Sequence, residues 1–104
     1  MSAGKECGDI LEHLACFGDL LVAGEVPTAG DIAEGNQMRL AASTLLGQIA
    51  RDVGAGFPKL QRQLIIAARL VVAGLACSVE LRSFSGLARE VGATTRLPSE
   101  QKAS

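Results

Sequence analysis

The sequence predicts an all-α protein: an up-down bundle of three long helices, with room for a short fourth helix, completed by dimerisation. Apolar residues recur every three or four positions over long stretches of the 104-residue chain, and the glycines and prolines between these stretches lie where helices begin and end. Segment 64–77 is apolar on almost every side. Such a helix must be covered on all sides, and a chain this short is expected to need a second copy to cover it.

The first helix is expected over residues 5–23, because it stops at Gly24 with Pro27 shortly beyond. Its apolar positions follow a helical period and predict the face that packs on the core. These are Ile10, Leu14, Phe17 and Leu21.

The second helix has two candidate starts. Asp31 with Glu34 fits a capping box, and so does Thr28 with Asp31. The helix is expected to end at the glycines of segment 54–56. Its apolar face consists of Met38, Ala42, Leu45, Ile49 and Val53.

The third helix is expected to begin at Phe57 and Pro58, since proline suits the first helical position, and to reach at least Leu81. A bend over residues 83–86 would leave residues 87–91 as the short fourth helix. We therefore expect one helical-bundle domain over residues 1–92 and a flexible C-terminal tail over residues 93–104.

Composition indicates a folded chain, with 48% hydrophobic and 20% charged residues and a net charge of −1. Residues 1–52 hold eight acids and three bases, whereas residues 53–104 hold three acids and seven bases. The opposed charges predict that the acidic first helix packs beside the basic third helix, within one chain or across a dimer. Alternatively, the basic half meets an anionic partner.

The cysteines and the apolar run indicate where in the cell the protein is expected. Cys7, Cys16 and Cys77 have no metal-ligand spacing, and no basic-then-apolar leader opens the chain, so a cytoplasmic protein with reduced thiols is expected. The apolar run of residues 64–77 is interrupted by Arg69 and is shorter than the roughly 20 residues that span a bilayer. We expect no membrane partner.

The function predicted from these features is a non-catalytic helical association or adaptor module, which self-assembles through the third helix and binds a protein partner. Small and apolar residues on that helix would let a neighbouring helix approach closely. The expected oligomer interface consists of Ala67, Leu70, Gly74, Cys77, Ser78 and Leu81.

An alternative is a helix-turn-helix DNA-binding regulator using residues 46–64. Its recognition helix would offer Lys59, Gln61, Arg62 and Gln63 to a groove. Segments 49–55 and 87–93 resemble each other, but each also fits the last turn of a helix followed by a left-handed glycine. Because the chain is nearly neutral and has no basic arm, we do not expect nucleic acid as a partner.

A second alternative is a helical metal site or an enzyme whose active site forms between subunits. Asp9, His13 and Cys16 lie at helical spacing beside Glu12 and could converge on a metal ion. The chain has no second histidine, and the same residues fit an exposed charged surface with an Asp9–His13 contact. We therefore predict no catalytic residue, no resident metal and no cofactor.

Overall fold

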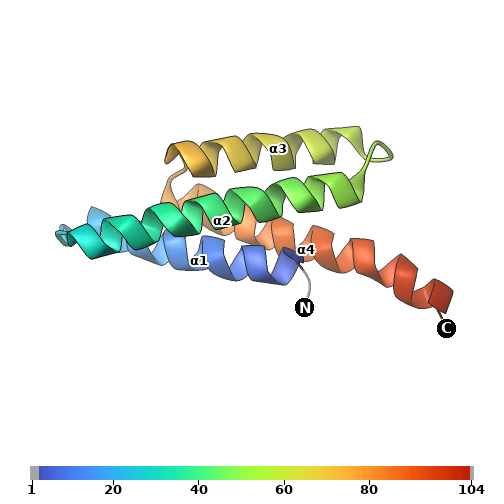
Figure 1. The fold of residues 1–104 in the computed structure, drawn as a ribbon, viewed down its shortest axis with the longest axis horizontal. Coiled ribbons are helices and arrows are strands. Elements are labelled where there is room, and N and C mark those ends of the chain that lie inside the picture. The colour runs from blue at the N-terminus through green and yellow to red at the C-terminus, as the bar shows by residue number, and fades with distance from the viewer. Residues whose placement is uncertain (1–2, 104) are drawn as a thin grey trace.

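A computed structural model describes residues 3–103 of the chain, and the side chains of residues 3–93. Within this range the protein is all-helical, with no strands, and its helices pack together (Figure 1). The all-α prediction is confirmed. The helices are α1 (Ala3–Val22), α2 (Ala29–Val53), α3 (Pro58–Ala73) and α4 (Ser78–Ala103).

The start of α2 is fixed by Thr28. Its hydroxyl Oγ1 accepts a hydrogen bond from the Asp31 backbone N–H at 3.1 Å, and the Asp31 carboxylate accepts one from the Thr28 N–H at 3.2 Å. This reciprocal pair is a capping box. Of the two candidate starts, Thr28 with Asp31 is therefore the one that the structure uses.

The third helix ends earlier than predicted. α3 stops at Ala73, not at or beyond Leu81, because Gly74 adopts a left-handed conformation with φ of 72°. The backbone N–H groups of Gly74 and Leu75 then donate to the carbonyls of Val71 and Leu70 at 3.1 and 2.9 Å, which closes the helix in a Schellman motif.

The fourth helix is long rather than short. α4 begins at Ser78, where the Glu80 carboxylate accepts a hydrogen bond from the Cys77 backbone N–H at 3.3 Å. It passes without interruption through residues 83–86, where a bend was expected, and its backbone remains helical over residues 93–103, the expected tail. The flexibility of that segment stays a prediction.

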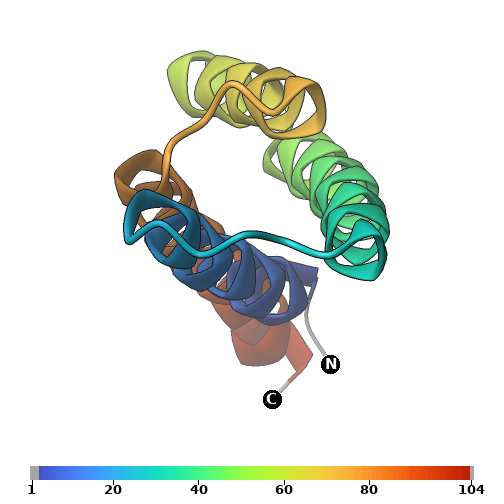
Figure 2. The same cartoon turned by 90° about the vertical axis from the view of Figure 1, so that its left-hand side faces the viewer.

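The helices form two antiparallel pairs, α1 with α4 and α2 with α3 (Figure 2). Small residues bring α1 and α4 together. A Cβ atom added to Gly4 would lie 2.7 Å from the Cα atom of Gly92, and one added to Gly18 would lie 3.3 Å from the Ser78 side chain. Of the two similar segments, residues 49–55 end α2, whereas residues 87–93 do not end a helix. The glycine of the second segment, Gly92, is buried inside α4 against α1.

The core lies between the two pairs. The buried face of α1 includes Gly4, Cys7, Gly8 and Leu11, and is rotated from the predicted face, of which only Leu14 is buried. Ile10 and Phe17 are half-buried and Leu21 is exposed. The largest fully buried side chains come from α1, α2, α3 and α4: Leu11, Leu46, Ile49, Leu64, Val71, Cys7 and Ser85.

One end of the molecule is thinner than the rest. α4 begins beside Gly18, and α3 ends at Gly74 beside Arg39. The last turn of α1 and the first turns of α2 therefore extend beyond the other two helices, as Figure 1 shows. Several large apolar side chains are exposed on this extension: Leu20, Leu21, Val22, Val26 and Ile32.

Candidate functional site

The predicted oligomer interface is not one continuous stripe, because the helix that should carry it ends at Ala73. Ala67 on α3 and Leu81 on α4 are buried in the core of the same chain, and Leu70 is half-buried. Gly74 and Cys77 are exposed in the connection between the helices, and Ser78 begins α4 beside Gly18. The six residues are therefore divided between two helices and a turn.

The outward side of α3 remains uncovered. The backbone of this helix packs along that of α2, approaches α4 only over a few residues and is not a neighbour of the α1 backbone. Ile65, Ile66 and Val72 are 40%, 48% and 45% exposed. The charged residues of α3 are all basic and exposed: Lys59, Arg62 and Arg69. The exposed side of α3 is therefore both apolar and cationic, and we call these six residues the α3 face.

Residues 46–64 do not have the arrangement expected of a helix-turn-helix. α2 runs unbroken to Val53, and α3 returns alongside it, with the Gln61 amide donating to the Ala50 carbonyl at 3.1 Å. A helix-turn-helix instead crosses its two helices at a steep angle. Gln61 thus caps α2, whereas Lys59, Arg62 and Gln63 are exposed, and DNA binding by them stays a prediction.

The structure does not gather the three metal candidates, Asp9, His13 and Cys16 of α1, into a metal site among the described residues. Asp9 pairs with Arg89 of α4 at 2.7 Å rather than with His13. His13 lines a recess between α1 and α2, and Cys16 is exposed. No group of three or more His, Cys, Asp or Glu residues that could hold a metal ion is present in the described part of the chain.

Acids of α1 face bases of α4 along the line where these helices pack. Arg82 pairs with Asp19 and, at 3.6 Å, with Glu12, while Arg89 pairs with Asp9. The hydrogen bond from Arg82, followed by one from Ser78, lowers the pKa of the Asp19 carboxyl. Opposite charges thus pair within the chain, but the prediction that the acidic first helix packs beside the third helix is wrong, because the bases that face α1 belong to α4.

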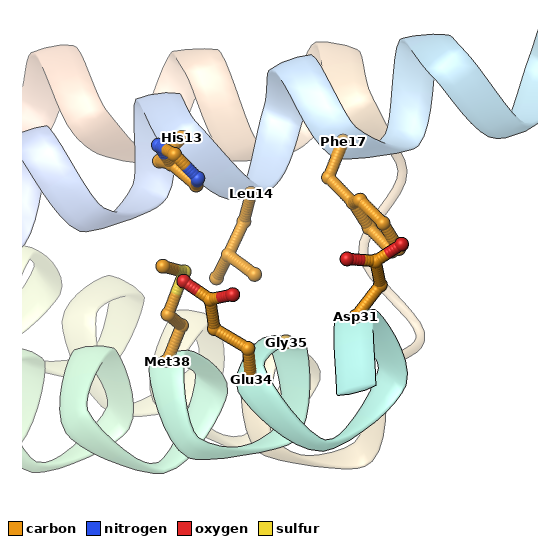
Figure 3. A pocket seen from close by; sticks show the side chains of 7 residues that line it. All are labelled: His13, Leu14, Phe17, Asp31, Glu34, Gly35 and Met38. Carbon is orange, nitrogen blue, oxygen red and sulfur yellow. The ribbon is translucent and has the colours of Figure 1, made fainter. Parts of the chain in front are cut away.

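A recess lies between α1 and α2 (Figure 3). Leu14 and Phe17 point toward α2, while Glu34 and Met38 point toward α1. Its volume, about 80 Å³, is well below the 300–1,000 Å³ typical of small-molecule sites. The remaining lining residues are His13, Asp31 and Gly35.

Helical spacing extends this recess into a longer surface. Residues at intervals of three, four or seven share a face of a helix, so the recess residues His13 and Met38 have neighbours along α1 and α2. Among these neighbours the apolar residues are half-buried and the acidic residues are exposed. We call this surface the α1–α2 seam, and it consists of Glu6, Ile10, His13 and Phe17 of α1 with Asp31, Glu34, Met38 and Leu45 of α2.

Sequence reasoning missed the α1–α2 seam. Its apolar residues fit the periodicity of the core, because half-buried and buried positions share one helical period, and its acids contribute only to the overall acidity of residues 1–52. The signal that could have found it is the spacing of Glu6, Ile10 and His13, which puts acidic and apolar side chains on one face.

A second recess, of about 140 Å³, lies at the thin end of the molecule. It shares Phe17 and Gly35 with the first, and it is also lined by Arg39, whose side chain lies beside Gly74. Its other lining residues are Leu21, Pro27, Ile32 and Asn36.

Comparison of the chain with protein-family models, curated proteins and solved structures finds no significant match. Among the described residues, no helix has an apolar stretch long enough to cross a lipid bilayer.

Proposed function

We propose that this protein is a non-catalytic helical association module, an up-down bundle that self-assembles through α3 and binds a protein partner. The observation that carries the proposal is the α3 face, where Ile65, Ile66 and Val72 are exposed beside the basic residues Lys59, Arg62 and Arg69. Apolar side chains gathered on one face of a helix favour contact with another protein surface.

The free energy gained by burying the apolar residues of the α3 face can be compared with the free energy that association costs. Full burial of a Val or Ile side chain contributes about 1.5–3 kcal/mol, so burying the exposed portions of these three would contribute about 2–4 kcal/mol. Association of two proteins costs about 4 kcal/mol or more in lost rotational and translational freedom. The three apolar residues alone therefore do not suffice, and the bases around them must also find partners.

Native mass spectrometry of the full chain tests this proposal. The wild-type protein is expected as an oligomer, and Ile66→Glu should increase the dissociation constant at least about tenfold, because it places a charge in an apolar contact. The control is Leu40→Glu, which introduces the same charge at another exposed apolar residue, on α2. A monomeric wild-type protein, or equal effects of the two variants, would contradict self-assembly through α3.

A further inference from the structure

We propose that the α3 face of one copy docks on the α1–α2 seam of the next copy, in a head-to-tail arrangement. This inference rests on the proposed self-assembly and specifies which surface α3 binds. The seam belongs to α1 and α2, and the backbones of α1 and α3 are not neighbours in the described part of the chain. The α3 face is exposed on its own chain, so its docking partner is taken from another copy.

Charge argues against α3 binding to α3. The helix carries Lys59, Arg62 and Arg69 and no acidic residue. Two copies of this face meeting across a two-fold axis would bring these bases together, which is unfavourable. The bases need an acidic surface, and the acids of α1 nearest α4 are already paired with Arg82 and Arg89.

The α1–α2 seam supplies such a surface. Its exposed acids are Glu6, Asp31 and Glu34, and half-buried apolar residues lie between them. Asp31 also accepts the capping hydrogen bond from Thr28, but a carboxylate has room for further donors. His13 lies in the same seam, and Arg39 lies outside it, in the second recess.

The spacing of the charges matches. Lys59 precedes Arg62 by three residues, as Asp31 precedes Glu34. Arg69 follows Arg62 by seven residues, about 10 Å along a helix.

The position of Glu6 completes the match. The Cys7 thiol donates to the Ala42 carbonyl at 3.7 Å, so the neighbouring Glu6 of α1 lies at nearly the same height along the bundle as residue 42 of α2. Residue 42 follows Glu34 by eight residues, which is about 12 Å along the helix. The pairs are thus Lys59 with Asp31, Arg62 with Glu34 and Arg69 with Glu6. In this register α3 lies parallel to the α2 of its partner.

The apolar residues fall between these pairs. Ile65 and Ile66 come half-way between Arg62 and Arg69, and Met38 comes half-way between Glu34 and residue 42. Gly35 lines the recess, and a Cβ atom added to it would meet nothing within 4 Å, so there is open space for an incoming side chain.

The geometry has a consequence for assembly size. Since the two surfaces differ, each added copy leaves one α3 face and one seam unoccupied, and the assembly closes into a ring or grows as a chain.

A charge exchange tests the inference. Arg62→Glu and Glu34→Arg should each weaken self-association at least about tenfold by placing like charges together, and the double variant Arg62→Glu/Glu34→Arg should restore it. Both residues are exposed, so the fold should persist, which circular dichroism checks. Glu25→Arg, at an exposed acid in the α1–α2 connection, is the control and should leave the oligomer unchanged.

The outcomes distinguish the two proposals. If the wild-type protein is monomeric at every concentration, both are wrong. If it assembles and Ile66→Glu disrupts it while Glu34→Arg has no effect, α3 is an interface but the seam is not its partner. Failure of the double variant to recover also overturns the docking on the seam.

Discussion

A Cβ atom added to Gly92 of α4 would lie 2.7 Å from the Cα atom of Gly4 in α1, and the reverse addition gives the same distance. Real Cβ atoms do not come so close to another backbone. The two helices therefore touch backbone to backbone at this point, and the glycines are required on both sides.

Gly92→Ala should lower the free energy of unfolding by about 1–3 kcal/mol, because the added methyl group forces two backbones apart. The control is Gly86→Ala in the same helix, where the new Cβ atom meets nothing within 4 Å. There alanine should stabilise the protein by about 0.5–1 kcal/mol. Urea unfolding of both variants measures the difference in stability. If Gly92→Ala were as stable as the wild type, α1 and α4 would not be in close contact at this point.

Asp19→Asn should reduce stability at neutral pH and have progressively less effect as the solution becomes acidic. The hydrogen bonds from Arg82 and Ser78 lower the pKa of Asp19 from its ordinary value of 3.8. A lowered pKa means that the stabilisation is complete above 3.8 and is lost as the pH falls through the folded-state value.

Urea unfolding of the wild type and Asp19→Asn from pH 7 to about pH 2 checks this expectation. Asp52→Asn, at an exposed carboxylate near the end of α2, serves as the control. A difference between the wild type and Asp19→Asn that does not change with pH would contradict the assignment of the stabilisation to the charged Asp19.

Cys7 should resist alkylation in the folded protein, while Cys16 and Cys77 react. Burial, with a smaller contribution from Glu6, raises the pKa of the Cys7 thiol to about 12, and its side chain is inaccessible. The thiolate is the reactive form, so reaction at Cys7 requires unfolding. Mass spectrometry after brief iodoacetamide treatment should find two modified cysteines in native buffer and three in denaturant; rapid labelling of Cys7 in native buffer would be incompatible with its place in the core.

Thr28→Ala should destabilise the protein by about 1 kcal/mol, since it removes the hydroxyl that caps α2. Thr44→Ala makes the same chemical change inside the helix, where the Thr44 hydroxyl only donates to the Leu40 carbonyl at 3.0 Å. Alanine is the better helix former there, so stability should hold or rise. Comparing the thermal unfolding of the two variants isolates the contribution of the cap to stability. Equal stabilities of Thr28→Ala and Thr44→Ala would show that the cap contributes nothing.

The sequence predicted the helical class, the C-terminal ends of α1 and α2 to within one residue and the first residue of α3, because glycine and proline residues mark them directly. It missed the end of α3. Gly74 has apolar residues on both sides, so the hydrophobic periodicity continues across it. From the sequence alone, a glycine inside a helix cannot be distinguished from a glycine that ends the helix.

The face of α1 was misjudged for a related reason. Large apolar residues define a helical stripe, whereas Gly4, Gly8 and Ala15 carry almost no hydrophobic signal although they are buried. What buries them is the close approach of α4, a contact between segments far apart in the chain. The α1–α2 seam likewise depends on which helices are neighbours, and periodicity within one helix does not contain that information.

The pairing of α1 with α4 also has a consequence for the order of folding. α2 and α3 are joined by a short turn and can form their contact as soon as both exist, while α1 must wait for a partner that begins 56 residues after its own last residue. During synthesis the glycine-lined side of α1 is therefore open until three further helices, α2, α3 and α4, have been made. We expect that interval to be when the nascent chain is most exposed to chaperones and to mispairing with other chains.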